Sequence, residues 1–333
     1  MIRLGIAGFG YWGPNVARAF DATDNVKIVS ICDGNPSRLA HARKLYPGIS
    51  FTSDVNEILT SPNIDAVAVI TPVSTHFDLA QRALLNGKHV FVEKPFTSTA
   101  GQATELVNLA ERKRLKIMVD HTFLYTPAVN KIKEIIDGGI LGNLYYFDSM
   151  RVNLGLFQHD VNVVWDLAPH DLSIMDYLIR QKPDAVVATG QAHLNGLEDV
   201  AYLTLYFPNN IIAHCNVNWL SPVKVRTTLI GGHKKMLLWN DLDADEKIKI
   251  YDKGVEVTTQ ENIYNLLVSY RSGDMWVPKL DRAEALRLEA EAFVNCVLHD
   301  ETPPNDGEAG LRVVRILEAA TKSLKGRGAL VLL

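Results

Sequence analysis

The stretch Leu4-Gly5-Ile6-Ala7-Gly8-Phe9-Gly10-Tyr11-Trp12-Gly13-Pro14-Asn15 decides the fold of this chain. Its apolar start predicts a buried strand, and its proline is a favourable first residue for a helix. Gly8, Gly10 and Gly13 have the spacing G-x-G-x-x-G. In such a turn the first glycine permits the tight bend, the second lets a pyrophosphate approach the backbone, and the third lets helix and strand pack closely. The stretch therefore predicts a dinucleotide site.

A carboxylate stands where such a site needs one. The apolar run 26–32 ends at Asp33, twenty residues beyond Gly13. An acidic side chain there can accept hydrogen bonds from the adenosine ribose, and it repels a 2′-phosphate. This favours NAD over NADP, although Arg38 nearby leaves NADP open. The alternative is an ordinary turn at residues 33–36, where Asp, Gly, Asn and Pro follow one another.

Composition excludes several classes of protein. The 333 residues are 47% hydrophobic and 22% charged with a net charge of -4, so neither a nucleic-acid partner nor a membrane surface is expected. The chain has no apolar run long enough for a membrane span, and its first strand begins too early for a signal peptide. Cys32, Cys215 and Cys296 are scattered and fit no metal site. They predict reduced thiols and a cytoplasmic protein.

The first 120 residues alternate strand and helix patterns. Continuous apolar runs at 65–70 and 89–92 are typical of a parallel sheet that is buried on both faces. Further elements are expected as helices at 36–46, 54–59, 77–86 and 99–113 and as a strand at 116–119. The class is therefore α/β, with a doubly wound Rossmann domain at residues 1–120. Its ligand should lie at the carboxyl ends of the strands.

The pattern changes after residue 120. Strands separated by short turns predict an antiparallel sheet in a second domain at 121–333. The strands are expected at 144–152, 185–192, 200–207, 211–217, 223–230, 235–239 and 247–251, and the helices at 127–137, 161–180, 282–299 and 308–325. The segment from about 255 to 279 has no clear period and predicts a loop or an arm.

Three side chains could perform acid–base chemistry. Asp166 and His170 are four residues apart, so on a helix they share a face, and a carboxylate beside an imidazole orients it and raises its basicity. Such a pair can take the proton of a hydroxyl whose carbon loses hydride. Lys94, at the end of a predicted strand, could stabilise the developing negative charge. Pro169 would kink that helix, so the pair could instead flank a helix start.

These motifs together resemble the Gfo/Idh/MocA oxidoreductase family over essentially the whole chain. The resemblance is carried by the glycine motif, by Thr71-Pro72-Val73-Ser74-Thr75-His76, by Gly87-Lys88-His89-Val90-Phe91-Val92-Glu93-Lys94-Pro95 and by Asp166-x-x-x-His170. It implies that the second domain is an α/β domain with a large, mostly antiparallel sheet. It also implies NAD as cofactor, catalysis by Lys94, Asp166 and His170, and an oligomer, a homodimer or a homotetramer, formed through the second domain's sheet. The expected cofactor contacts are Gly8, Gly10, Tyr11, Trp12, Gly13, Asp33, Thr71, Pro72, His76, Glu93, Lys94 and Trp165.

The residues within these motifs resemble those of family members associated with nucleotide-sugar and cell-surface glycan synthesis. This implies oxidation of the 3-hydroxyl of a UDP-N-acetylhexosamine or its uronic acid, with an aminotransferase as a possible pathway partner. Tyr125, Arg151 and Asn153, together with His170, are expected to face the sugar, with a surface salt bridge as the alternative for Arg151. Other functions that stay open are an NADPH-dependent ketosugar reductase, an inositol or free-sugar dehydrogenase, and a non-catalytic cofactor-binding regulator.

Overall fold

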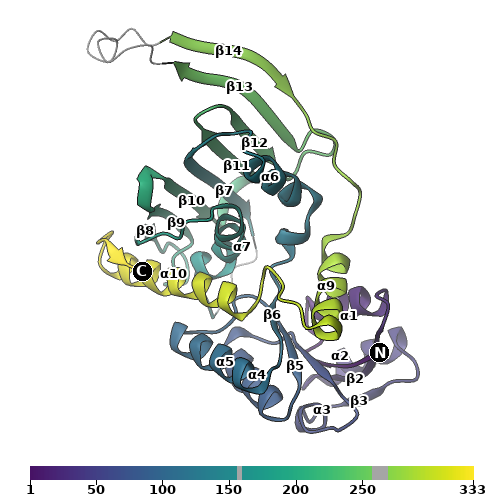
Figure 1. The fold of residues 1–333 in the computed structure, drawn as a ribbon. Helices are drawn as coiled ribbons and strands as arrows, with labels where there is room; N and C mark the ends of the chain where they lie inside the picture. The colour runs from purple at the N-terminus through teal and green to yellow at the C-terminus, as the bar shows by residue number, and fades with distance from the viewer. Residues whose placement is uncertain (156–159, 257–268) are drawn as a thin grey trace. The chain divides into compact units, whose positions relative to one another are not determined.

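The chain forms two units by its internal contacts (Figure 1). The computed structural model describes residues 1–155, 160–256 and 269–333. The first unit comprises residues 1–126 and 283–315, and the second comprises residues 127–282 and 316–333. The sequence predicts a second domain that runs unbroken from 121 to 333. The structure differs, because residues 283–315 return to the first unit.

The first unit is built on a six-stranded parallel sheet. Its strands are β1 (Ile2–Ala7), β2 (Val26–Cys32), β3 (Ser50–Thr52), β4 (Ala66–Val69), β5 (His89–Val92) and β6 (Ile117–Val119). Their order in the sheet is β3-β2-β1-β4-β5-β6. This is the order of a dinucleotide-binding doubly wound fold, in which the strand order reverses between β1 and β4. The predicted fold class of this unit is confirmed.

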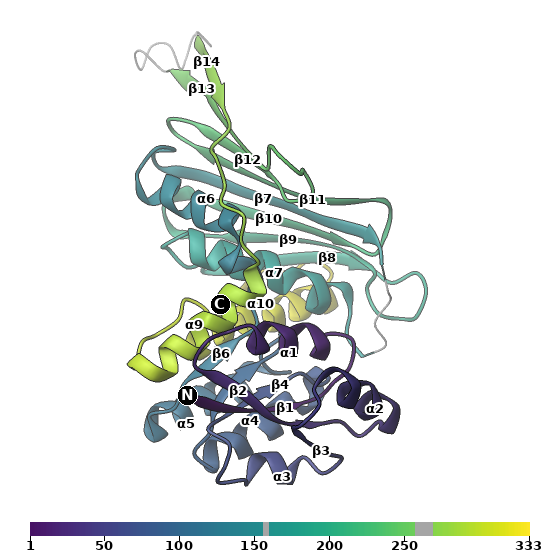
Figure 2. The same cartoon turned by 90° about the vertical axis from the view of Figure 1, so that its right-hand side faces the viewer.

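Helices cover both faces of this sheet. They are α1 (Gly13–Asp21), α2 (Pro36–Leu45), α3 (Asn56–Leu59), α4 (His76–Leu85), α5 (Ala100–Lys113) and α9 (Ala285–His299), with the short 3₁₀ helices η1 (Val73–Thr75) and η2 (Thr122–Tyr125). Figure 2 shows α1 and α9 on one face and α4 and α5 on the other. The rings of Phe20, Phe91 and Phe293 pack edge to face, with centroids 5.3–5.9 Å apart. These contacts explain why the late helix α9 belongs to the first unit.

The second unit is built on a nine-stranded sheet. Its strands are β7 (Leu144–Leu154), β8 (Ala185–Gln191), β9 (Val200–Tyr206), β10 (Ile212–Asn218), β11 (Leu220–Gly232), β12 (Met236–Asn240), β13 (Ile248–Glu256), β14 (Ser269–Trp276) and β15 (Val331–Leu332). Their order is β14-β13-β12-β11-β7-β10-β9-β8-β15. Among the described strands of this second sheet, only β7 and β10 pair in parallel. The mostly antiparallel sheet is confirmed.

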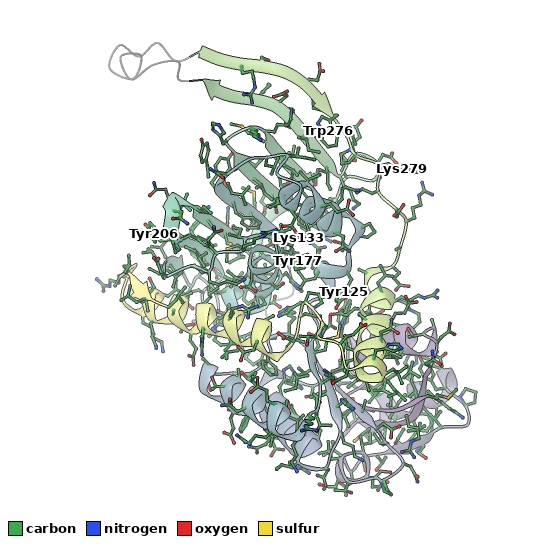
Figure 3. All side chains as sticks on the ribbon, in the orientation of Figure 1. Tyr125, Lys133, Tyr177, Tyr206, Trp276 and Lys279 are labelled. Carbon is green, nitrogen blue, oxygen red and sulfur yellow. The ribbon has the colours of Figure 1, made fainter. Side chains whose placement is uncertain are left out.

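The helices of this unit are α6 (Pro127–Asp137), α7 (Val163–Leu178) and the part of α10 (Gly307–Lys325) from Ile316 onward, and η3 (Pro208–Asn210) joins two strands. Helix α7 packs on β7, β9 and β10. Figure 3 shows Lys133 of α6 beside Tyr177 of α7, and the Lys133 Nζ lies 5.5 Å from the ring centroid. This cation–π contact ties α6 to α7.

Large apolar side chains of the nine-stranded sheet are exposed. They include Met150, Tyr202, Tyr206, Ile212 and Leu229, each 39–43% exposed. Tyr206 and Ile212 lie directly opposite each other on β9 and β10, so their side chains are on the same face of the sheet. Tyr202 is on that face too, because every second side chain of a strand points the same way. Tyr206 of this group is labelled in Figure 3. An exposed apolar sheet surface of this kind is typical of a protein–protein contact.

The element boundaries mostly follow the sequence pattern. Within the segment from 255 to 279, which predicts a loop or an arm, the structure has the end of β13 and the strand β14, while residues 257–268 lie outside the described residues.

Cys32, Cys215 and Cys296 are buried and unbridged, and burial raises the pKa of the Cys215 thiol to about 12. In the described ranges, no helix is long and apolar enough to cross a membrane.

Candidate active site

The three glycines of the glycine-rich turn differ in what a side chain at each position would meet. Gly8 has a φ of +101°, and a Cβ there would lie 2.1 Å from the Ile70 carbonyl oxygen, so no other residue fits. At Gly13 a Cβ would lie 2.9 Å from the Gly8 oxygen. At Gly10 it would meet only the Arg38 guanidinium, at 3.6 Å. Packing therefore requires Gly8 and Gly13, whereas Gly10 keeps a path to the backbone open for a ligand.

Asp33 fixes this turn from the end of β2. One carboxylate oxygen accepts the Phe9 N–H at 2.7 Å, and the other accepts the Asn35 N–H at 2.8 Å. Its side chain is 5% exposed, and the Arg38 Nη1 lies 3.6 Å from it. Asp33 thus has the turn-forming role that was the alternative to ribose binding. Its contact with the ribose stays a prediction.

The beginning of helix α1 is suited to an anion. Trp12 stands at its cap position without a side-chain cap, and the first turn carries no acidic residue. A helix N-terminus favours phosphate oxygens, although Pro14 has no N–H and the next two N–H groups donate to the Trp12 carbonyl. The Trp12 indole N–H donates to Asp120 Oδ2 at 2.9 Å, which fixes the ring, while Tyr11 is 87% exposed. Tyr11 is therefore the aromatic residue of the turn that can cover a bound ligand.

Lys94 follows β5, and the neighbouring backbone is held by a buried imidazole. His76 is 1% exposed, and its ring nitrogens lie 2.9 Å from the Pro95 oxygen and 2.7 Å from the Thr71 oxygen. Burial lowers the pKa of His76. The ring is buried in this arrangement, and its predicted contact with the cofactor stays a prediction. The geometry supports a role in which His76 ties the turn at Thr71 and Pro72 to the segment that carries Glu93 and Lys94.

Asp166 and His170 both lie within α7, so they share one face of the helix. Pro169 lies inside the helix, and the alternative in which the two residues flank a helix start is wrong. The indole N–H of Trp219, a fully buried side chain between β10 and β11, donates to Asp166 Oδ2 at 3.1 Å. Asp166 is in the first helical turn, where its negative charge is favourable. Sequence reasoning missed Trp219, because no motif links it to a residue 53 positions earlier.

Arg151 forms a buried ion pair beside this helix. Its Nε and Nη2 donate to the two Asp171 oxygens at 2.9 Å each, and both side chains are at most 5% exposed. The pair anchors α7 to β7. Arg151 therefore forms a salt bridge, but in the interior and not on the surface as the alternative from the sequence had it. Its contact with the substrate stays a prediction. Arg226 is its cross-strand neighbour on β11 and has a side chain that is 34% exposed. Burial and Arg151 lower the pKa of Arg226.

The remaining predicted residues have these surroundings. The Trp165 indole donates to the Thr321 hydroxyl at 2.9 Å, and the Tyr125 hydroxyl donates to Asn305 Oδ1 at 2.7 Å. Asn153 is half-buried on β7, two residues from Arg151 and therefore on the same face. Figure 3 labels Tyr125 in the first unit. For Trp165, Tyr125 and Asn153, contact with a ligand stays a prediction.

Comparison with known proteins decides the family. The model described as "Oxidoreductase family, NAD-binding Rossmann fold" matches residues 2–121, and the model of the GFO/IDH/MocA C-terminal domain matches residues 129–237. The chain belongs to the Gfo/Idh/MocA oxidoreductase family. The resemblance inferred from the motifs is confirmed, and so is the inference that the chain is an enzyme.

Members of this family with different substrates are similar to the chain. UDP-N-acetylglucosamine 3-dehydrogenase of Acidithiobacillus ferrooxidans is 26% identical over 94% of each chain, and its solved structure has a TM-score of 0.81 over 98% of each chain. The scyllo-inositol 2-dehydrogenase (NAD(+)) of Bacillus subtilis is 24% identical over 90% of this chain and 86% of its own. The scyllo-inositol dehydrogenase of Lactobacillus casei, solved with NAD(H) and scyllo-inositol, is 19% identical, with a TM-score of 0.80 over 100% of this chain and 99% of its own.

The residues of the first unit fit a family NAD site. Gly10 leaves the turn open, the beginning of α1 favours phosphate, and Asp33 stands at the end of β2. NAD bound there would supply the acceptor for a hydride. The same geometry leaves NADP possible, because the Arg38 guanidinium beside Asp33 could meet a 2′-phosphate.

The balance between these two groups gives a testable expectation. In the variant Asp33→Asn, the ratio of the NADH and NADPH dissociation constants should shift toward NADPH by about tenfold, equivalent to about 1.4 kcal/mol, because the repelling charge is removed and Arg38 is no longer neutralised. In Arg38→Ala the ratio should shift toward NADH. Titrations of nicotinamide fluorescence measure both ratios. An unchanged ratio in both variants would show that these residues do not set the cofactor preference.

Proposed function

We propose that the protein is an NAD-dependent dehydrogenase that oxidises a secondary hydroxyl of a sugar. The observation that carries the proposal is that Asp166, held by Trp219, and His170 share one face of α7, in a chain whose other unit is an NAD-binding domain. A regulator that only binds a cofactor has no need of an oriented acid–base pair. For this reason the catalytic function is preferred to the regulatory one.

In the proposed reaction each residue has one task. His170 accepts the hydroxyl proton while the hydrogen on the same carbon leaves as hydride, so the C–O single bond becomes a carbonyl. Asp166 orients the imidazole and stabilises its positive charge after the proton arrives. Lys94 donates a hydrogen bond to the substrate oxygen, which carries negative charge during the transfer. NAD bound in the first unit would supply the acceptor for this hydride.

The proposed substrate is a UDP-N-acetylhexosamine or its uronic acid, oxidised at C3. The relative from A. ferrooxidans supports this choice, since the similarity extends over nearly all of both chains. Arg226 adds support, because this partly exposed guanidinium is the cross-strand neighbour of Arg151, although it also pairs with Asp241 at 3.4 Å. A guanidinium there suits a diphosphate or a carboxylate better than a neutral inositol. The ketone formed would suit a following transamination.

A panel of substrates tests this proposal. Purified protein is supplied with NAD and either UDP-N-acetylglucosamine, its uronic acid, inositols or free hexoses, with a ketone trap present to draw the equilibrium forward. We expect NADH with the UDP-sugars alone. NADH with inositol or hexose alone would discard the proposed substrate, and NADPH oxidation with a ketosugar, without NADH formation from any hydroxyl, would favour the reductase.

A homo-oligomer in the cytoplasm completes the proposal. The exposed apolar side chains of the nine-stranded sheet, such as Tyr202 and Leu229, support contact between two copies through this sheet. Light scattering of the purified protein should give the mass of a dimer or a tetramer. A monomeric mass at micromolar concentration would remove this part of the proposal and leave the proposed chemistry intact.

A further inference from the structure

A second acidic residue lies buried against Asp120, in a position that the proposed reaction does not use. Glu289 comes from α9 and is 0% exposed, and Asp120 follows β6 and is 2% exposed. The Asn305 amide nitrogen donates to both Glu289 Oε1 and the carbonyl of Val119, the residue before Asp120, and burial and then Asp120 raise the pKa of Glu289. Both residues belong to the first unit. A buried pair of this kind needs a physical explanation, because two ionised carboxylates in contact repel each other strongly.

The hydrogen bonds of Asp120 and Glu289 indicate different protonation states for the two carboxyl groups. Asp120 accepts on both oxygens: Oδ2 accepts the Trp12 indole N–H at 2.9 Å, and Oδ1 accepts the Thr122 hydroxyl. This is the pattern of an ionised carboxylate. Glu289 accepts the Asn305 amide on Oε1 at 2.8 Å, whereas its buried Oε2 has no donor in the described part of the chain. A proton on Oε2 would turn this atom into a donor toward Asp120.

The orientation of Asn305 is fixed independently. Its amide nitrogen also donates to the Val119 carbonyl at 2.6 Å, and its amide oxygen accepts the Tyr125 hydroxyl at 2.7 Å. The nitrogen therefore faces Glu289 Oε1, which leaves Oε2 for Asp120. Burial, followed by Asp120, raises the pKa of Glu289 well above its ordinary range. The carboxyl of Glu93 also raises this pKa, and a hydrogen bond with the Thr122 hydroxyl acts in the opposite direction.

We propose that Asp120 and Glu289 share one proton, carried on Glu289 Oε2, and that this pair positions Trp12 and the glycine-rich turn for dinucleotide binding. Trp12 lies between Gly10 and Gly13, and its indole N–H is held by Asp120. Loss of the proton would place a second negative charge against Asp120 and weaken its hold on the ring. Glu289 is thus a positioning residue that acts through Asp120. The proposal rests on dinucleotide binding and needs no sugar.

Infrared spectroscopy tests the shared proton. A buried, protonated carboxylic acid has a carbonyl band that ionised carboxylates lack. At neutral pH we expect this band in the wild-type protein and its loss in Glu289→Gln. The variant Glu291→Gln, on the same helix and ion-paired with Arg287, is the control and should retain the band. Identical spectra of the wild-type protein and Glu289→Gln would overturn the proposal.

Binding of NADH tests the positioning role without any sugar. Trp12→Phe keeps the ring but removes the N–H donor, and Glu289→Ala removes the partner of Asp120. We expect each to weaken NADH binding by about 3- to 10-fold. The double variant should bind NADH no more weakly than the more impaired single variant, since both substitutions disrupt the same Trp12–Asp120–Glu289 interaction. Losses that multiply in the double variant, or an absence of loss in both singles, would contradict the proposal.

The variant Glu289→Gln supplies the rescue. A glutamine can donate to Asp120 and accept from Asn305, so it imitates the protonated acid. We expect NADH binding by Glu289→Gln to stay within about twofold of the wild-type value, since no hydrogen bond is lost. Affinity as low as in Glu289→Ala would overturn the proposal. If Glu289→Ala fails to fold, the infrared band and Glu289→Gln still decide the matter.

The pH dependence of stability provides a further readout. Because the pKa of Glu289 is raised in the folded chain, folding retains a proton that the unfolded chain releases above the ordinary glutamate range. Wild-type stability should therefore fall relative to Glu289→Gln as pH rises from the ordinary glutamate range toward the raised pKa of Glu289. Thermal unfolding at several pH values measures this difference. A difference that does not change with pH, together with a missing infrared band, would exclude the shared proton.

Discussion

Replacement of Lys94 by alanine is expected to lower kcat for sugar oxidation by about 10²- to 10³-fold, the usual effect of removing one donor to a developing oxyanion. Lys94 follows β5 at the carboxyl edge of the parallel sheet, where ligands of such folds bind. NADH binding should change little, because the glycine-rich turn and the beginning of α1 are untouched. Initial rates at saturating sugar and a separate NADH titration give the two values.

The lysine on the exposed surface of α5 provides the matched control. Lys113→Ala removes the same charge from the same unit, and it should leave both turnover and NADH binding unchanged. If Lys94→Ala retained full turnover, the role of Lys94 as the donor to the substrate oxygen would be refuted. If Lys94→Ala lost NADH binding in proportion to turnover, Lys94 would belong to the cofactor site alone.

Replacement of His170 by alanine should lower kcat by about 10²- to 10⁴-fold, the usual contribution of a general base. The expected cause is the loss of the acceptor for the hydroxyl proton, while the Asp166–Trp219 hydrogen bond and the α7 backbone remain. The NADH dissociation constant should stay within about twofold, since His170 belongs to the unit without the glycine motif. His299→Ala, at the exposed end of α9, is the control with normal activity.

Two outcomes would argue against His170 as the base. Full turnover in His170→Ala would show that another group or water takes the proton. Loss of folding, measured by thermal unfolding, would make His170 structural, and His170→Asn would then be tested because it keeps a polar side chain of similar size.

The sequence predicts the fold well where each pattern is local. The glycine motif, the apolar strands at 66–69 and 89–92 and the turns between the later strands act over a few residues, and the two sheets follow from them. The return of α9 to the first unit could not be predicted. It depends on contacts of Phe293 with Phe20 and Phe91, which are about 200 residues or more away in sequence.

The candidate site was predictable to the same extent. Its motif residues, such as Lys94 and His170, lie next to regular elements whose ends can be read from the sequence. Trp219, which donates to Asp166, and Glu289, which accepts from Asn305, carry no motif, because a single hydrogen bond to a distant partner leaves no spacing pattern. His76 has a structural role that its motif position does not indicate, because its ring is buried between two carbonyl oxygens. Its cofactor contact stays a prediction.

The most direct test of the central claim follows a hydrogen atom. UDP-N-acetylglucosamine and its uronic acid, each deuterated at C3, are incubated with the enzyme, NAD and the ketone trap, and the NADH formed is analysed by mass spectrometry. The account predicts NADH that carries one deuterium, because hydride moves from the sugar carbon to the nicotinamide ring. NADH without deuterium, or no NADH from either sugar in a protein that binds NAD, would contradict it.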